Sequence, residues 1–341
     1  MHLRKRLRNL LHSLKDKASV IAASLSNNRH VSSVRIHVVR ATTHSFYAPP
    51  SEAKISAVLS AGRGSYLLPR ACIDALMDRL HKTQNATVAL KCLFTIHNII
   101  AKGPLTLKDN LSHYPSHGGN NNLNLSAFRD NTDTETLELS SWVRWYANIL
   151  EHVLTVSRAV GYYLSSSKGE FLGARGDLLR EIRVLVDFVE HVSHVPESLH
   201  LQRNDLVYEV VRLVREDYGN VQREILWRVE EVGKRVEGLD VVELRQLVGC
   251  LGRMEECKER LVLLFVNRKR NDVFWDLIGG VKRKGVAMVE EMEGNWVTVV
   301  TAKNESADLT RYVNPFLDSP GGAWPRGDED LFRLTVSTVG F

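Results

Sequence analysis

Apolar residues, mostly leucine and valine, recur every three or four positions over long stretches of this 341-residue chain. This spacing places the apolar side chains on one face of an α-helix, whereas a half-buried strand would alternate them every second residue. Only nine prolines and 7% aromatic residues accompany this pattern. The sequence therefore predicts an all-α protein rather than a sheet.

The composition is that of a soluble globular protein, with 44% hydrophobic and 25% charged residues, and it allows a sizeable core. No run of about 18 uninterrupted apolar residues occurs, so we expect any membrane contact to be peripheral. The four cysteines lack the paired spacing of a zinc site and are too few for a disulfide framework. We expect them to be reduced core thiols of a cytosolic protein.

Charge is distributed unevenly along the chain. Residues 1–110 carry 17 Lys and Arg against 5 Asp and Glu, while the remainder carries 28 against 35. A molecule with one basic end fits an anionic surface at that end, either lipid or nucleic acid. Charge alone does not choose between the two surfaces.

Helix-breaking residues divide the chain into a basic amphipathic arm (1–19), a helical domain (20–293) and a flexible tail (294–341). Short helices between Val31 and Lys102 are separated by Pro49–Pro50, by Gly62 to Gly64 and by Gln84–Asn85. A surface loop is expected at 113–122. The longer helices are expected at about 136–165, 177–194, 196–219, 220–236, 240–267 and 272–293, with Gly238 and Gly279–Gly280 as stops or kinks.

The arm places its leucines on one helical stripe, with basic residues around it. One interpretation is an interfacial helix on anionic lipid, and the other is a first bundle helix with its leucines packed inward. A third interpretation, an organellar transit peptide, follows from the scarcity of acid, since Asp16 is the single acidic residue in positions 1–40. The candidate membrane-arm residues are Leu3, Leu7, Leu10, Arg4, Lys5, Arg6 and Arg8.

No catalytic pattern stands out: the sequence has no Gly-rich phosphate loop, no HExxH and no nucleophile elbow. His191 and His194 lie one turn apart, but histidines near a helix end more often cap it or face solvent than bind a ligand. We therefore expect no enzyme activity, no metal and no cofactor. The aromatic set Trp142, Trp145 and Tyr146 is expected to pack in the core.

Several blocks carry a resemblance to a known family. VVRATTHSFYAPP (Val38 to Pro50), ALKCLFTIHNIIAKG (Ala89 to Gly103), LNLSAFRD (Leu123 to Asp130) and SSWVRWYANIL (Ser140 to Leu150) resemble the ANTH domain of the clathrin assembly proteins. The matching blocks span about 32–163, and the segment from Cys257 to Ile278 is similar to later helices of the plant subgroup. The resemblance implies an ANTH-like superhelical solenoid of antiparallel helices.

The resemblance also implies docking on phosphoinositide membranes, including phosphatidylinositol 4,5-bisphosphate, through Arg40, His44 and Lys54. Arg40 matches a family Lys that contacts an inositol phosphate, and His44 matches a second family position. This sequence departs from the family after the prolines, where a basic cluster is reduced to Lys54 and is preceded by Glu52. An acidic residue there would repel phosphate, which puts the specific head-group site in doubt.

Two short motifs in the tail point to protein partners. Asn314, Pro315 and Phe316 form the tripeptide that EH-domain proteins recognise. Asp330, Leu331 and Phe332 resemble the peptides by which clathrin assembly proteins touch clathrin or adaptor appendages, although a hydrophobic patch that folds back on the helices is the alternative. Asp177-Leu178-Leu179 also spells a clathrin-type tripeptide, but its leucines are expected to be buried on a helix.

By resemblance, the function is that of an endocytic adaptor at clathrin-coated pits and coated vesicles, with the Golgi as a further location and SNAREs as a further partner of the later helices. The alternative is a helical scaffold that works through protein partners without a specific lipid site. A nucleic-acid binder ranks third, because the basic arm has no aromatic residue between Met1 and Phe46 on which a base could stack.

Overall fold

The structure, a computed structural model, describes residues 2–25, 28–46, 48–114, 123–166, 177–265 and 272–307; for 2–9 and 295–307 it describes the helix without its side chains. All regular elements within these ranges are helical, which confirms the predicted all-α class. The chain divides into two compact units, Met1–Met292 and Glu293–Phe341.

The α-helices are α1 (His2–Ser24), α2 (Arg29–Ala41), α3 (Glu52–Leu59), α4 (Leu67–Lys82), α5 (Ala86–Lys102), α6 (Leu105–Ser112), α7 (Thr134–Val160), α8 (Leu178–Ser193), α9 (Asp205–Lys234), α10 (Val241–Glu256), α11 (Lys258–Leu264) and α12 (Asp272–Ala307). Short 3-10 turns are η1 (Ser60–Arg63), η2 (Leu164–Ser166), η3 (Leu199–Arg203) and η4 (Val236–Gly238).

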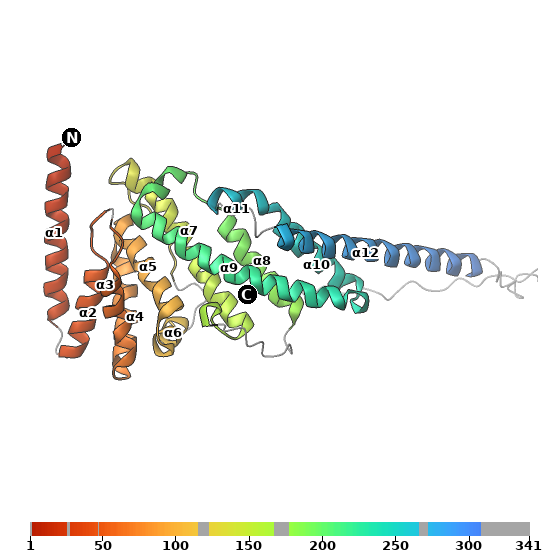
Figure 1. Cartoon of the computed structure of the whole chain (residues 1–341), viewed down its shortest axis with the longest axis horizontal. Coiled ribbons are helices and arrows are strands. Elements are labelled where there is room, and N and C mark those ends of the chain that lie inside the picture. Colours follow the sequence, from red (N-terminus) through yellow and green to blue (C-terminus); the bar gives the residue numbers. More distant parts are fainter. Residues whose placement is uncertain are drawn as a thin grey trace, which may run out of the picture. The chain divides into compact units, whose positions relative to one another are not determined.

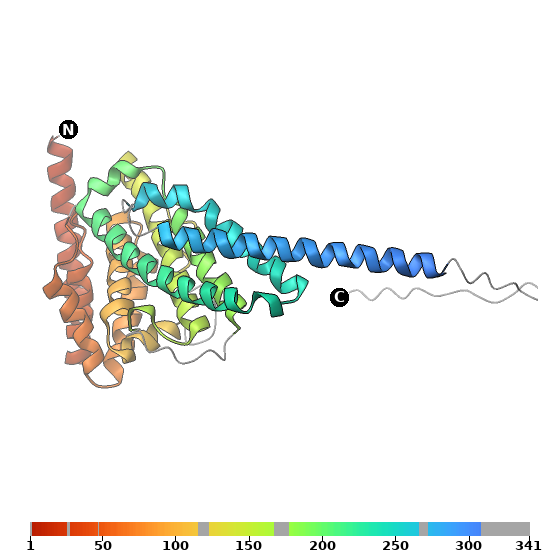
Figure 2. The same ribbon diagram turned by 45° about the vertical axis from the view of Figure 1, so that its right-hand side comes forward.

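Helices that are close in sequence pack on one another through the first unit. In the ribbon views α1 lies against α2, α2 against α4, α5 against α7, and α8 against α7, α9 and α10 (Figures 1 and 2). This serial packing is that of a helical solenoid, as predicted. It leaves α1 at one end of the stack, with α2 as its main neighbour.

Helix α5 forms the centre of the N-terminal half. Every residue from Ala86 to Ile100 is buried, because the helix is apolar nearly all round and other helices cover it on several sides. The side chain of Asn85 accepts a hydrogen bond from the backbone N–H of Val88 and so caps the helix, as predicted for this position. The core continues through Trp142 and Tyr146 of α7, which are buried as expected.

Several predicted helix ends are wrong. The break expected between Gly219 and Asn220 does not exist, because α9 is continuous and Tyr218 and Val221 on either side of that point are both buried. The helix does not stop at Gly279–Gly280, because both residues lie inside α12. A single glycine costs a helix only about 1 kcal/mol, which packing of the flanking residues readily offsets.

Other boundaries also differ. The helix expected at 240–267 ends at Glu256, and α11 begins anew after Cys257. At the ends of the domain, α1 runs through the predicted arm boundary at residue 19, and α12 continues beyond residue 294 to Ala307. Both ends retain enough helix-forming residues to extend past the points where the apolar periodicity fades.

Candidate anion-binding groove

A groove of about 920 Å³ lies between α1 and the C-terminal end of α2 with the loop that follows it. Its walls come from one face of α1, around Asp16 and Lys17, and from the segment between Val39 and Ala48. Two of the predicted lipid-binding residues, Arg40 and His44, line it. The basic character of its rim and its position at the end of the stack make it the candidate functional site.

Asp16 and His44 join the two walls of the groove. The Nδ1 atom of His44 lies 2.6 Å from Oδ1 of Asp16, and the backbone N–H of His44 donates to Oδ2 of Asp16 at 3.1 Å. Burial raises the pKa of Asp16, but the hydrogen bonds from His44 and the charges of His44 and Arg79 outweigh it and hold that pKa below its ordinary value. Asp16 is therefore a carboxylate at neutral pH.

Arg79 of α4 lies next to the Asp16–His44 pair. Its Nε and Nη2 atoms donate to the carbonyl oxygen of Thr42 at 3.2 and 2.7 Å, and Nη2 lies 3.6 Å from Oδ1 of Asp16. Thr42 is itself buried, and its hydroxyl donates to the carbonyl oxygen of Val38 at 2.7 Å. Thr42 therefore ends α2 and gives Arg79 a fixed anchor.

Lys91 of α5 lies behind the loop. It is only 1% exposed, and its ammonium donates to the carbonyl oxygen of Ser45 at 2.6 Å and to the hydroxyl of Thr43 at 3.4 Å. Burial, and to a smaller extent the positive charge of Lys54, lowers the pKa of Lys91 to about 8, while the charge of Asp16 opposes the shift. The charges of Lys54 and of Asp16 in the groove thus both influence the protonation of Lys91.

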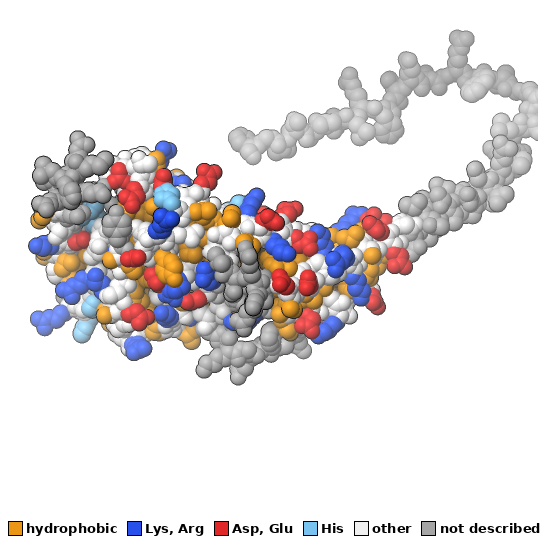
Figure 3. All heavy atoms as spheres, turned by 45° about the horizontal axis from the view of Figure 1, so that its top comes forward, with side chains coloured by type: hydrophobic (Ala, Val, Ile, Leu, Met, Phe, Trp, Pro, Cys, Tyr) orange, Lys and Arg blue, Asp and Glu red, His pale blue; other side chains and the backbone are white. Residues whose placement is uncertain are grey.

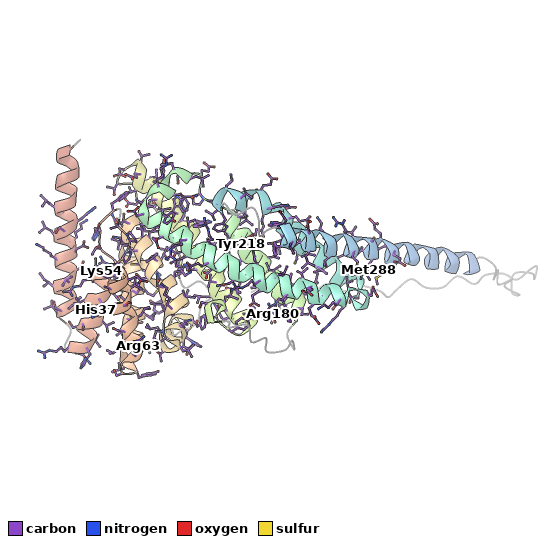
Figure 4. The ribbon with its side chains drawn as sticks, in the orientation of Figure 1. His37, Lys54, Arg63, Arg180, Tyr218 and Met288 are labelled. Atoms are coloured by element: carbon purple, nitrogen blue, oxygen red, sulfur yellow. The ribbon has the colours of Figure 1, made fainter. Side chains whose placement is uncertain are left out.

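The three predicted head-group residues are only partly brought together. Arg40 and His44 line the groove, whereas Lys54 lies exposed in the first turn of α3 and is not part of the lining. Figure 4 shows Lys54 near His37 of α2, with Arg63 further along the same end of the unit. Glu52, expected to repel phosphate, has Lys102 as a partner at 3.5 Å.

Three residues of the site were missed by sequence reasoning: Asp16, Arg79 and Lys91. The signals were present, because Asp16 is the only acid in the first 40 residues and Lys91 interrupts an apolar helix within the family motif. Arg79 carried no such signal. It is not part of the groove lining and comes within 3.6 Å of Asp16 because α4 packs against α2.

The arm residues lie on α1, but the side chains of Leu3, Leu7, Arg4, Lys5, Arg6 and Arg8 are outside the described part of the chain. Leu10, Leu11 and Leu14 are 62%, 53% and 62% exposed. These three leucines thus do not fill the core, in contrast to the interpretation in which the leucines of this helix pack inward. Figure 3 shows Lys and Arg side chains spread over the end of the unit that begins with α1.

His191 and His194, which the sequence did not assign to a ligand site, contact backbone carbonyl groups near the end of α8. Nδ1 of His191 lies 2.7 Å from the carbonyl oxygen of Asp187, and Nδ1 of His194 lies 2.7 Å from that of Glu190. Within the described ranges, no three His, Cys, Asp or Glu side chains cluster as a metal site requires. All four cysteines are buried and free, and burial raises the pKa of Cys72 and Cys92 to about 12.

The partner motifs are resolved unevenly. Asp177 caps α8 by accepting from the backbone N–H of Arg180, and Leu178 and Leu179 pack against the core, as expected for this tripeptide. Asn314, Pro315, Phe316, Asp330, Leu331 and Phe332 lie outside the described residues. Among the helices that are described, none combines the length and apolar character needed to cross a bilayer.

Comparison with known proteins agrees with the fold and with the motif positions. A sequence profile of the family described as ANTH domain matches residues 33–201. Three proteins of Arabidopsis thaliana named Putative clathrin assembly protein, At4g40080, At5g10410 and At5g65370, are 38%, 32% and 28% identical to this chain. The alignments cover 84%, 80% and 73% of this chain and 82%, 84% and 88% of the respective relative. The chain therefore belongs to the ANTH-domain clathrin assembly protein family.

Proposed function

We propose that this protein is an adaptor of clathrin-mediated endocytosis that binds phosphoinositide-containing membrane through the α1–α2 groove and engages coat proteins through its tail. The name shared by the Arabidopsis relatives supports the clathrin part of the proposal. The groove supports the membrane part, because Lys17 on its α1 wall and Arg40 and His44 on the opposite wall all line it. Its location is then the cytosolic face of coated pits and coated vesicles, with Golgi membranes as a further candidate.

The groove is the observation that carries the proposal. Phosphate groups are bound by hydrogen-bond donors held in fixed geometry; His44 is held by its two contacts with Asp16, and the exposed Arg40 lines the groove beside it. The arm adds a less specific attraction: its first 17 residues carry six bases and one acid. At roughly 1 kcal/mol per base near an anionic leaflet, this adds on the order of 5 kcal/mol as an upper bound.

The test is sedimentation of the full chain with vesicles that contain phosphatidylinositol 4,5-bisphosphate or charge-matched phosphatidylserine. Arg40→Glu/Lys54→Glu is expected to abolish the preference for the phosphoinositide. The matched control is Arg223→Glu/Lys234→Glu, which makes the same charge change at exposed positions of α9. Deletion of residues 1–17 is expected to weaken binding to both kinds of vesicle.

Other results would change the assignment. Equal binding to both lipids that is lost only on deleting the arm would mean a nonspecific electrostatic anchor. No binding at all would favour the helical scaffold that works through protein partners alone. Binding of duplex or single-stranded nucleic acid at physiological salt would favour the third class.

The tail motifs are tested separately. Phe316→Ala is expected to abolish capture by an isolated EH domain, and Leu331→Ala/Phe332→Ala is expected to weaken capture by clathrin and adaptor appendages. Each variant serves as the control for the other. We also propose that the later helices contact a SNARE. Binding of the 1–293 fragment to a SNARE helix tests this contact. The alternative function remains a helical scaffold that works through protein partners without a specific lipid site.

A further inference from the structure

Among the described residues that line the groove, Asp16 is the only one with a carboxylate. It accepts from the backbone N–H of His44, lies 2.6 Å from the His44 ring nitrogen and lies 3.6 Å from the Arg79 guanidinium. A backbone N–H, an imidazole and a guanidinium that converge on one anion are the donors that bind a phosphate group. The carboxylate therefore occupies a position suited to a phosphate.

We propose that His44, which lines the groove, and Arg79, which lies beside Asp16 outside the lining, form a phosphate-binding site, and that Asp16 occupies this site in the free protein, so that α1 competes with the lipid head group. This inference rests on the proposed function and adds to it a further binding residue, Arg79, and an internal competitor. A phosphate monoester of the head group carries more charge and more acceptor oxygens than a carboxylate, so it can displace Asp16 from the same donors.

Arg79 keeps its place when Asp16 leaves. Two of its donors, on Nε and Nη2, are anchored on the carbonyl oxygen of Thr42, which belongs to the domain and not to α1. A guanidinium has five N–H donors, so the remaining ones can turn to a phosphate. The backbone N–H of His44 likewise belongs to the loop after α2 and stays with the domain.

Few of the described side chains of α1 are buried, so we expect its release from the domain to cost little free energy. Among its described side chains only Ala23 is buried, while Leu10, Leu14 and Ile21 are exposed. Its further contacts include the hydroxyl of Ser32 with the carbonyl oxygen of Ala23 at 3.0 Å, a 3.5 Å contact between Arg79 and Ser19, and the ring of His12, whose centroid lies 5.1 Å from that of His44. Loss of the Asp16 contacts therefore removes the strongest of the interactions that hold the middle of α1 against the domain.

The experiment compares the full chain with Asp16→Asn in vesicle sedimentation. The control is Asp78→Asn, which removes one negative charge at an exposed position of α4 where Asp78 pairs with Lys82 at 3.0 Å. Asp16→Asn is expected to bind phosphatidylinositol 4,5-bisphosphate vesicles about fivefold more tightly than wild type, because an internal competitor lowers the apparent affinity. Asp78→Asn is expected to bind as wild type does.

Two further measurements keep the inference open to contradiction. Hydrogen exchange of the α1 amides without lipid is expected to be faster in Asp16→Asn than in Asp78→Asn. Arg79→Gln is expected to reduce binding to the phosphoinositide while leaving binding to phosphatidylserine unchanged. Arg79→Lys keeps the charge but loses the planar arrangement of guanidinium donors, and it is expected to recover part of the phosphoinositide binding. Unchanged phosphoinositide binding by Arg79→Gln would exclude Arg79 from the site.

The outcomes separate this inference from the proposed function. If wild type prefers the phosphoinositide but Asp16→Asn binds no more tightly than Asp78→Asn, the internal competitor is overturned and the adaptor function stands. If none of these proteins prefers the phosphoinositide, both are overturned. If Asp16→Asn also bound phosphatidylserine vesicles more tightly, the gain would be explained by the change in net charge. That result would contradict a phosphate site.

Discussion

Two histidine–aspartate pairs lie at different depths in the molecule. His44 and Asp16, 2.6 Å apart, join α1 to the end of α2 with side chains 12% and 20% exposed. His97 and Asp217, 2.9 Å apart, join α5 to α9 in the core with side chains 1% and 8% exposed. The chemistry of the two pairs is the same, but water and other anions can replace the partner of His44 and cannot reach His97.

The neighbouring residues of the two pairs also differ, in keeping with their different exposure to solvent. His97 also has the hydroxyl of Tyr146 2.8 Å from its Nδ1, and burial raises the pKa of that tyrosine well above its ordinary value. The pair at His44 instead opens on a groove lined by Lys17 and Arg40. We infer that the inner pair serves to lock three helices together and that the outer pair is exchangeable.

The largest expected effect separates the two carboxylates. Asp217→Ala is expected to lower the free energy of unfolding by about 3 kcal/mol, because it leaves the buried Nε2 of His97 without a hydrogen-bond partner. Asp16→Ala is expected to lower it by about 1 kcal/mol or less, because both members of its pair are partly solvated. Denaturant unfolding of the two variants measures the contrast, and equal losses would remove the distinction between a locked and an exchangeable pair.

Loss of one hydroxyl gives the next largest effect. Tyr146→Phe is expected to cost about 1–3 kcal/mol, since Nδ1 of His97 then has no partner and no water can reach it. Tyr208→Phe, at an exposed position of α9, is the control and is expected to change stability by less than about 0.5 kcal/mol. A loss that is no greater in Tyr146→Phe than in Tyr208→Phe would mean that His97 has a second route to a partner.

A titration tests the electrostatics of the groove. We expect Lys91 to titrate at about 8 by NMR, with Lys54→Met raising its pKa and Asp16→Asn lowering it. Because the unfolded chain then binds more protons than the folded chain above that pKa, the free energy of unfolding should rise with pH from about 8 up to the ordinary lysine value. Lys91→Met should lack this rise. An unchanged Lys91 pKa in both charge variants would show that neither Lys54 nor Asp16 acts on it.

The smallest expected effect on stability belongs to the exposed stripe of α1. Leu14→Ala is expected to change the free energy of unfolding by less than about 0.5 kcal/mol, because the side chain is already in water. Binding to anionic vesicles should nevertheless weaken. Leu263→Ala, an equally exposed leucine of α11, is the control that should bind vesicles as wild type does. A large loss of stability in Leu14→Ala would show that α1 is packed by its leucines.

Periodicity predicted most helices because local propensity and burial of one face agree along most of the chain. It failed at Gly219 and at Gly279–Gly280, where a residue that ends many helices is carried through by packed neighbours on both sides. It also placed the end of the last long helix before Ala307. Helix ends depend on packing and capping contacts that a pattern of apolar residues does not contain.

The candidate site was predicted in part. Arg40 and His44 were found through a motif that is contiguous in sequence, and both line the groove. Arg79 and Lys91 approach the same loop from other helices, at 37 and 46 residues from the carbonyl groups that they contact. No local pattern indicates such pairs.

By itself, the sequence determined the helical class, the family, the basic N-terminal end and the position of the buried aromatic residues, because each of these depends on composition or on neighbours within a few turns. Only the tertiary structure decided that the single acid of the basic arm faces His44 and Arg79, and that Lys91 is buried behind the same loop. The physical reason is that charge pairing and desolvation depend on distance in space, which is set when α1, α2, α4 and α5 pack together.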